Sequence, residues 1–294
     1  MTLRKVWAFI RLTRPLFLFG GVALNALGLA VAAQQGYPID AGRAVVGQLL
    51  VTSIQLLAHY ANEYFDVEVD RLIGGRRTWF SGGSGVLAAG ELDRIVARRA
   101  IILCAVMALS AIAIASSQAP IMLLVGSISL AGAYFYSAPP LSLMGSGLGE
   151  LSTALLTGLL VPVTGFAMQT GRIDPALLPL CLPLVAAYLA MIVAFQFPDR
   201  VADAVVGKQT LAVRLGLTGA ARLHNALIAF SLMWLVLWLA IRWAWLSAPL
   251  AVWQMLAAAR LARSGAEDYR WFTAGAVALS GLLPLLMLID RIGQ

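Results

Sequence analysis

The sequence predicts an all-α membrane protein, a polytopic helical bundle of about nine transmembrane helices. Of the 294 residues, 61% are hydrophobic and only 12% are charged, with a mean hydropathy of +0.85. Water-soluble domains typically carry about 25% charged residues. This composition excludes a disordered chain, a disulfide scaffold, a nucleic-acid-binding domain with a basic surface and any large extramembrane domain. We therefore expect residues 1–294 to form a single transmembrane domain.

A spanning helix needs roughly 20 mostly apolar residues, and apolar windows of about that length follow one another along the chain. In order they are residues 15–33, 44–61, 97–116, 119–136, 150–169, 176–196, 222–241, 245–259 and 271–289, the eighth being short. The first window follows basic residues and ends in Ala-Val-Ala-Ala, which is also typical of a signal peptide. Eight further windows follow, and the basic residues alternate between the two sides most consistently if the first window is kept as a span. We therefore expect this window to be a membrane anchor and not a cleaved signal peptide.

The basic residues predict the orientation in the membrane. If alternate loops are assigned to alternate sides, all but four of the 21 Lys and Arg residues fall on one side. The four exceptions are Arg43, Arg172, Arg242 and Arg291. Loops rich in Lys and Arg stay in the cytoplasm, so we expect the N-terminus inside and the C-terminus outside. In a bacterium the protein would lie in the inner membrane. The net charge of +7 thus indicates topology, and no nucleic-acid partner is expected.

Two cytoplasmic segments, residues 62–94 and 196–222, are longer than the other connections and hold acidic residues that are scarce elsewhere. Polar residues recur at helical spacing in both segments. They are Asn62, Asp66 and Asp70 in the first segment, and Gln196, Asp199 and Asp203 in the second. A spacing of four places such residues on one helix face. In each segment the aspartates are followed by a glycine, a basic residue and a threonine, which indicates two halves presenting equivalent sites to a shared space.

Clustered carboxylates need a cationic partner. Two like charges ~6 Å apart at an effective dielectric of ~20 repel by roughly 3 kcal/mol. Carboxylate and amide oxygens without Cys or His beside them favour a hard ion such as Mg²⁺, which completes its coordination with phosphate oxygens and water. We therefore expect a Mg²⁺-bridged diphosphate between the two segments. The alternative is that the aspartates are solvated helix ends paired with nearby arginines.

These motifs resemble the paired aspartate motifs of the UbiA superfamily of intramembrane prenyltransferases, and the resemblance extends over most of the chain. Three further segments carry it: Arg14-Pro15; Tyr136-Ser137-Ala138-Pro139-Pro140 followed by Gly147-Leu148-Gly149-Glu150; and Gly207 to Gly216, with the pattern Gly-Lys-x-Thr-Leu…Arg-Leu-Gly. The resemblance implies nine helices around a central cavity that the acidic segments cap on the cytoplasmic face.

The resemblance also implies a reaction. Mg²⁺, with two ions expected, would hold an isoprenyl diphosphate, and an electron-rich carbon of an aromatic acceptor would capture the allylic cation as diphosphate leaves. The implied metal ligands are Asn62, Asp66, Asp70, Asp199 and Asp203. Asn62, Arg71, Arg76, Lys208 and Arg14 would bind diphosphate, with Lys208 and the four aspartates as the catalytic set. Candidates for the prenyl or acceptor pocket are Tyr64, Tyr136, Ser137 and Gln196.

The segment from Thr78 to Leu87 contains Gly-Gly-Ser and resembles the loop of the dihydroxynaphthoate branch, as does Phe197-Pro198-Asp199. This favours 1,4-dihydroxy-2-naphthoate as acceptor, in menaquinone biosynthesis. Met144, Gln196 and Gln209 differ from the residues common in relatives. Acceptor identity therefore stays open, with 4-hydroxybenzoate, homogentisate and a non-aromatic lipid precursor as alternatives.

Two other functions fit the sequence less well. A CDP-alcohol phosphotransferase also clusters aspartates in a membrane, but its motif requires an Asp-Gly pair that is missing beside these aspartates. A secondary transporter usually binds its ions at mid-membrane on broken helices, whereas these acidic residues gather at one face. The expected partners are thus an isoprenyl diphosphate, an aromatic acceptor and membrane lipid, and the sequence leaves the oligomeric state open.

Overall fold

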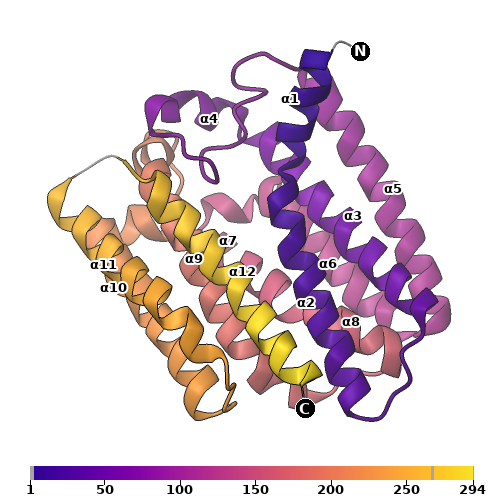
Figure 1. Ribbon diagram of the computed structural model, residues 1–294. Coiled ribbons are helices and arrows are strands. Elements are labelled where there is room, and N and C mark those ends of the chain that lie inside the picture. The colour runs from indigo at the N-terminus through magenta and orange to yellow at the C-terminus, as the bar shows by residue number, and fades with distance from the viewer. Residues whose placement is uncertain (1–2, 266–267, 294) are drawn as a thin grey trace.

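The computed structural model describes residues 3–265 and 268–293, and within these ranges every regular element is helical (Figure 1). The α-helices are α1 (Leu3–Thr13), α2 (Pro15–Gln34), α3 (Ala41–Phe65), α4 (Val67–Ile73), α5 (Arg94–Gln118), α6 (Ile121–Ser137), α7 (Gly149–Leu155), α8 (Val161–Thr170), α9 (Leu178–Val205), α10 (Leu211–Leu237), α11 (Ala248–Ser264) and α12 (Arg270–Ile292). Short 3-10 or π segments are η1 (Gly74–Arg76), η2 (Leu143–Gly145), η3 (Leu156–Leu160), η4 (Pro175–Leu177) and η5 (Ala244–Ser247).

The fold is that of a multi-pass membrane bundle, as predicted. Among the described residues, seven helical stretches are long and apolar enough to cross a membrane: α2, α3, α5, α7 with η3 and α8, η4 with α9, α10, and α12. Each of the nine predicted windows overlaps a helix, but α6 and α11 have only 17 residues each. Because both are shorter than the roughly 20 residues that a span needs, the predicted count of nine spans is not confirmed.

The helices pack around α2, α3 and α9. Helix α2 contacts α3, α8 and α12, while α9 contacts α7, α10 and α12. The N-terminal helix α1 and the C-terminal end of α12 lie at opposite ends of the bundle (Figure 1). A Cβ on Gly28 of α2 would lie 2.0 Å from the Pro162 carbonyl oxygen of α8. Small residues that let backbones touch are typical of helix pairs in membranes.

The break between α1 and α2 fixes one end of the bundle. Pro15 disfavours a helical conformation for the residue before it, and Arg14 adopts φ 51° and ψ 59° in the left-handed region. Helix α1 therefore ends at Thr13 and α2 starts in a new direction. Leu12 of α1 is buried, whereas Trp7 is exposed. The break leaves the Arg14 side chain beside the acidic segments.

The stretch between α7 and α8 contains a π-helical turn, η3. Pro162 at the start of α8 has no N–H to donate to the preceding turn. The extra residue in the turn places Leu156, Thr157 and Leu160 on the inner surface of the bundle, where they line a cavity. Single π turns inside α-helices occur frequently at functional sites.

The two acidic segments differ from the long loops that the sequence suggests. Helix α9 continues to Val205 and α10 begins at Leu211, so Asp199 and Asp203 lie in the last turns of α9. In the first segment α3 ends at Phe65 and α4 follows, leaving residues 77–93 as the only long irregular connection of the described chain. The second acidic site is thus carried on a rigid helix, and the first on a helix junction.

Candidate active site

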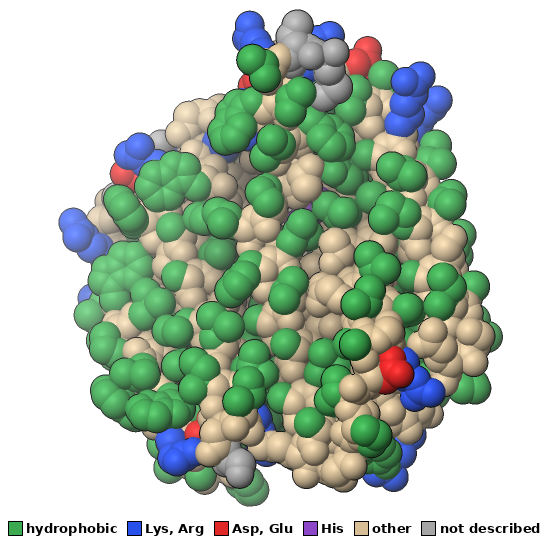
Figure 2. All heavy atoms as spheres, turned by 45° about the vertical axis from the view of Figure 1, so that its right-hand side comes forward, with side chains coloured by type: hydrophobic (Ala, Val, Ile, Leu, Met, Phe, Trp, Pro, Cys, Tyr) green, Lys and Arg blue, Asp and Glu red, His purple; other side chains and the backbone are tan. Residues whose placement is uncertain are grey.

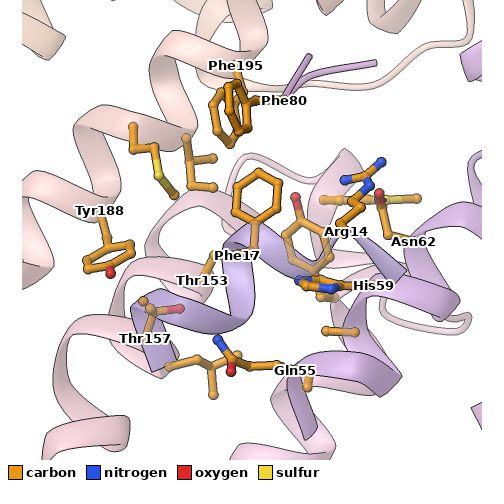
Figure 3. A pocket seen from close by; sticks show the side chains of 18 of the residues that line it. Arg14, Phe17, Gln55, His59, Asn62, Phe80, Thr153, Thr157, Tyr188 and Phe195 are labelled. Carbon is orange, nitrogen blue, oxygen red and sulfur yellow. The ribbon is translucent and has the colours of Figure 1, made fainter. Parts of the chain in front are cut away.

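A cavity of about 280 Å³ lies between α2, α3, α6, α7, α8 and α9 and beneath the acidic segments (Figure 3). Its polar end is lined by Asn62, Asp66, Asp70, Asp199, Asp203 and Lys208. Its other lining residues are mostly apolar and include Leu50, Ile54, Leu160, Met191 and Ile192. Leu50 and Ile54 precede Asn62 on α3 by two or more turns, so the apolar part extends toward the middle of the bundle. The shape suits a molecule with a charged head and a hydrocarbon tail.

Lys208 joins the two acidic segments. Its Nζ lies 2.5 Å from Asp66 Oδ1 and 3.6 Å from Asp203 Oδ1. Burial alone would lower the pKa of Lys208, but the carboxylates of Asp66 and Asp203 outweigh that effect and raise the pKa. Thr210 Oγ1 donates to Asp203 Oδ2 at 3.4 Å, and Asn62 Nδ2 donates to Asp66 Oδ2 at the same distance. One cation therefore holds a carboxylate from each segment.

The segment after α4 folds over the carboxylates. Arg77 Nη2 donates to the Asp70 carbonyl at 2.6 Å, and its Nε donates to the Gly82 carbonyl at 2.7 Å. Gly83 has φ +70°, and a Cβ there would lie 1.8 Å from Asp70 Oδ2. Ser81 Oγ lies 2.9 Å from Asp199 Oδ2, across to α9. Burial, and next the neighbouring Glu63, raise the pKa of Asp70 to about 7.

A buried ion pair lies beside this loop. Glu63 is 1% exposed and accepts from Arg14 Nη2 at 2.5 Å. It also accepts from Ser84 N at 2.5 Å and from Ser84 Oγ at 2.8 Å. Arg11 of α1 donates to the Ser84 carbonyl and pairs with Glu91. The Glu63 carboxylate therefore fixes both the chain break at Arg14 and the segment of residues 77–93 to α3.

Aromatic rings surround the cavity just below the carboxylates. Phe17 of α2 meets the rings of His59, Phe80 and Phe195 edge to face, with centroid separations of 5.8 Å, 5.8 Å and 6.0 Å. Figure 3 shows Phe17 facing Phe80 and Phe195, with Tyr188 on the far side of the space. The negative faces of aromatic rings attract cations. This part of the cavity can therefore accommodate both a planar aromatic molecule and a developing positive charge.

Most of the residues that the sequence singles out meet at this cavity. Those that line it are Arg14, Asn62, Asp66, Asp70, Tyr136, Gln196, Asp199, Asp203 and Lys208. The amide of Gln196 is also engaged by the protein, because its Nε2 donates to Glu150 Oε1 at 2.6 Å and its Oε1 accepts from Ala212 N at 3.1 Å. Gln196 thus ties α9 to α7 and α10 as well as facing the cavity.

Four of the predicted residues do not line the cavity in the described part of the chain: Arg71, Arg76, Tyr64 and Ser137. Arg71 is exposed and pairs with Glu68 one helical turn away at 2.8 Å. The ring of Tyr64 lies under Arg94, with 4.8 Å from Cζ to the centroid. Ser137 is buried at the end of α6. Helix α4 turns Arg71 outward, which the four-residue spacing alone does not reveal.

Several site residues were missed by the sequence analysis: Glu63, His59, Arg77, Ser81, Phe17 and Gln55. Glu63 and His59 lie in a span beside Asn62, and a polar residue inside an apolar span is itself a sign of function. That signal was available for both. Arg77 and Ser81 lie in the irregular segment, where only the folded loop reveals which side chains turn inward.

Comparisons with known proteins show the family to which the chain belongs. The profile of the UbiA prenyltransferase family matches residues 22–282. The chain is 29% identical to the 1,4-dihydroxy-2-naphthoate octaprenyltransferase of Escherichia coli (strain K12) over 84% of its own length and 83% of that protein. It is 30% identical to the protein of the same name from Mycobacterium tuberculosis, covering 76% of this chain and 75% of that protein.

Solved structures share the fold. The apo structure of a UbiA homologue from Aeropyrum pernix K1 superposes with a TM-score of 0.71 at 16% identity, covering 94% of this chain and 97% of that one. A UbiA homologue from Archaeoglobus fulgidus, bound to GPP and Mg²⁺, gives 0.68 at 18% identity and covers 97% and 98%. With a family profile matching most of its length over a multi-pass helical bundle, the chain belongs to the UbiA prenyltransferase family of integral membrane enzymes.

Proposed function

We propose that this enzyme transfers an isoprenyl group from an allylic polyprenyl diphosphate to 1,4-dihydroxy-2-naphthoate in a Mg²⁺-dependent reaction of menaquinone biosynthesis. The observation that carries the proposal is the meeting of four aspartates and Lys208 at the mouth of an apolar, aromatic-lined cavity. A polyprenyl diphosphate has the matching division into an anionic head and an apolar tail.

The residues present fit Mg²⁺. Asp199 Oδ1 is buried without a hydrogen-bond partner among the described residues, which a cation would supply. The donors are carboxylate and amide oxygens, which Mg²⁺ prefers. No three Asp, Glu, His or Cys side chains of the described chain are grouped closely enough to hold one ion. Because the candidate ligands come from two separate segments, we expect two ions, one at Asn62, Asp66 and Asp70 and one at Asp199 and Asp203, with diphosphate and water as the remaining ligands.

Bound Mg²⁺ would neutralise the negative charge that develops on the leaving diphosphate. The chain's own residues supply the rest. Lys208 and Arg14 are placed to bind diphosphate oxygens, and the loop at Gly83 closes over the head group. The rings of Phe17, Phe80 and Phe195 exclude water from the allylic carbon and offer π faces to its positive charge. A carbon of the acceptor ring then forms the new C–C bond.

The choice of acceptor rests on the names of the relatives and on the lining of the cavity. Relatives named 1,4-dihydroxy-2-naphthoate octaprenyltransferase match at 25% to 30% identity. One structural neighbour, at 15% identity and a TM-score of 0.63, is described as a digeranylgeranylglyceryl phosphate synthase. The aromatic lining favours a planar acceptor over such a lipid. The excess of Lys and Arg on the loops of the acidic end supports a cytoplasmic active site.

The test uses the purified protein in detergent with Mg²⁺. Each of 1,4-dihydroxy-2-naphthoate, 4-hydroxybenzoate and homogentisate is paired with prenyl diphosphates of increasing length, and products are identified by mass. We expect prenylated naphthoate product with release of diphosphate, and none when Mg²⁺ is chelated. Product from another acceptor alone would overturn the naphthoate assignment. An ion flux without diphosphate release would overturn the prenyltransferase proposal.

Four variants test the site assignment. Asp66→Ala, Asp70→Ala, Asp199→Ala and Asp203→Ala should each lower turnover by about 100-fold or more, as loss of transition-state charge stabilisation typically does. Asp268→Ala is the matched control, because Asp268 is exposed and pairs with the neighbouring Arg270, away from the cavity. Wild-type turnover in two of the four variants would show that these carboxylates do not hold the reacting head group.

A further inference from the structure

His59 lies on the cavity face of α3 but has no part in the proposed handling of diphosphate. Gln55, His59, Asn62 and Asp66 follow at spacings of four, three and four, which places them on one face of the helix. All four line the cavity. Three residues correspond to about 4.5 Å along a helix axis. His59 is therefore about one turn below Asn62, on the side of the apolar part of the cavity, where the proposed function puts the start of the prenyl chain.

The orientation of the His59 ring is fixed from the α1 side. Its Nδ1 lies 3.0 Å from the Thr13 carbonyl oxygen. This carbonyl is available because the chain breaks at Arg14, and Phe17 N donates to the Arg14 carbonyl instead. A carbonyl oxygen only accepts, so Nδ1 carries the hydrogen of this bond. Proton exchange at His59 is consequently confined to Nε2.

Nε2 is available to a ligand. No residue within 3–265 and 268–293 makes a hydrogen bond to it, and the atom is not among the fully buried polar atoms without a partner. In Figure 3 the imidazole lies between Arg14 and Gln55 and beside Phe17. An aromatic molecule stacked in this part of the cavity would thus have a fixed nitrogen acceptor at its edge.

We propose that His59 is a catalytic residue that activates the acceptor: Nε2 takes the proton of an aromatic hydroxyl group while the ring attacks. This inference rests on the proposed transfer to a hydroxylated aromatic acceptor. The O–H bond breaks and its electron pair moves into the ring. The ring carbon beside the oxygen forms a bond to C1 of the prenyl chain, and the C1–O bond breaks with its pair leaving on diphosphate. The attacked ring carbon then loses the substituent that it carried, as H⁺ to the departing diphosphate or as CO₂ from a carboxylate. The electron pair of that bond restores the aromatic ring, and the oxygen takes its proton back from Nε2.

No other group of the cavity suits this task as well. The other titratable groups of the lining that are bases at neutral pH are the four aspartates, which the proposed function commits to Mg²⁺ and the head group. Tyr136 and Tyr188 also line the cavity, but a phenol with an ordinary pKa of about 10 keeps its proton. Arg14 and Lys208 are cations engaged by Glu63, Asp66 and Asp203. The amide of Gln55 accepts hydrogen bonds but does not take up a proton. The imidazole at position 59 is therefore the base nearest to the reacting level.

Two substitutions of His59 distinguish a role as general base from a role in packing. His59→Asn keeps an N–H at the position of Nδ1, and so the bond to Thr13, but has nothing at Nε2. His59→Gln places an amide group there, which binds a hydroxyl without accepting its proton. General bases typically contribute 10²–10⁴-fold, so we expect both variants to lose about 100-fold in kcat for transfer. The KM for the prenyl diphosphate and its slow hydrolysis without acceptor should stay unchanged.

The matched control is His224→Asn, which changes the second of the two histidines in the chain. His224 is 0% exposed, bonds Asn225 through Nδ1 at 3.0 Å and packs against Phe272, away from the cavity. It should transfer at the wild-type rate once its Tm confirms folding. Wild-type transfer by His59→Asn, or an equal loss of transfer and hydrolysis, would overturn the role of His59.

A series of acceptors with increasingly acidic hydroxyl groups gives a second readout. The ratio of wild-type to His59→Asn rates should shrink as the hydroxyl becomes more acidic, because an acceptor that is already ionised needs no base. A constant ratio would mean that His59 only shapes the cavity. If the wild-type enzyme prenylates no hydroxylated aromatic compound at all, the proposed function fails instead, and the two failures are thereby distinguished.

Discussion

At the residue scale, the position of Asp70 depends on the absence of a side chain at Gly83. A Cβ there would lie 1.8 Å from Asp70 Oδ2, on a backbone with φ +70°. We expect Gly83→Ala to displace the carboxylate, raising the Mg²⁺ concentration needed for half-maximal rate and lowering turnover at least about tenfold, the equivalent of about 1.4 kcal/mol. Steady-state kinetics against Mg²⁺ measure both.

Gly75→Ala serves as the control for this change. Gly75 belongs to η1 near the same loop, and an added Cβ would meet nothing within 4 Å. It should leave the Mg²⁺ dependence unaltered. A normal Mg²⁺ response in Gly83→Ala would show that Asp70 tolerates the crowding and is not positioned by the glycine.

The ion pair of Glu63 and Arg14 is largely buried, with side-chain exposures of 1% and 17%. Removing one partner of a buried pair leaves an uncompensated charge and typically costs 3–5 kcal/mol. We expect Glu63→Gln to lower the thermal midpoint in detergent markedly. Glu68→Gln removes a pair that is exposed on α4 and should change stability by less than about 1 kcal/mol. Equal midpoints for the two variants would contradict this.

The sequence alone was enough to find the aspartates of the site, but not to decide which arginine of the first acidic segment turns inward. The aspartates could be found because carboxylates are costly near a bilayer and so need a reason to be there. Arg77 rather than Arg71 turned out to hold the loop, through the carbonyls of Asp70 and Gly82. The two arginines are only six residues apart in a basic stretch, and the end of α4 decides which one turns inward. No periodic pattern encodes that choice.

At the element scale, the segment of residues 77–93 acts as a cover attached to several helices. Hydrogen bonds and ion pairs tie Arg77 to α4, Ser81 to α9, Ser84 to α3, Thr78 to α12 and Glu91 to α1. Ser81 Oγ contacts both Asp199 Oδ2 at 2.9 Å and the Phe195 carbonyl at 2.6 Å. This hydroxyl is therefore the link between the loop of the first acidic site and the helix of the second.

Ser81→Ala removes that link. Hydrogen bonds to charged groups contribute about 1.5–3 kcal/mol, so the KM for prenyl diphosphate should rise by about 10- to 100-fold. Hydrogen exchange of the segment should become faster while that of α9 stays slow. Ser117→Ala is the control, since Ser117 Oγ donates to the Ile114 carbonyl within the exposed end of α5, away from the cavity. An unchanged KM in Ser81→Ala would mean that the cover closes without this contact.

The positions of the helices were largely accessible from the sequence, because each apolar window marks an uninterrupted hydrophobic length. Their ends were not. The polar residues from Gln196 onward suggest a loop, yet α9 continues to Val205 with Pro198 inside it. Packing of Ala202 against Val69 and Ile73 of α4 supports those last turns. Polarity at the end of a membrane helix marks the interface with water and not the end of the helix.

At the scale of the whole molecule, the bundle has two chemically different ends. Both acidic segments meet at the end near α1 and α4, while Gln35 binds Asp174 at 3.3 Å and so joins the connections after α2 and α8 at the other end (Figure 1). On the face that Figure 2 shows, hydrophobic side chains are spread over the surface between the ends, and most charged groups lie toward the top and bottom. A bilayer normal along this axis follows from that distribution.

The orientation in the membrane can be measured by labelling, because Cys104 and Cys181 are both buried and should be unreactive. Arg71→Cys on α4 and Arg172→Cys after α8 introduce thiols at side chains that are 51% and 57% exposed. With a membrane-impermeant maleimide, we expect Arg172→Cys to label in intact cells and Arg71→Cys only in inverted vesicles. Labelling of both from one side would contradict the bundle topology. The reverse pattern would leave the fold intact and place the active site on the outer face.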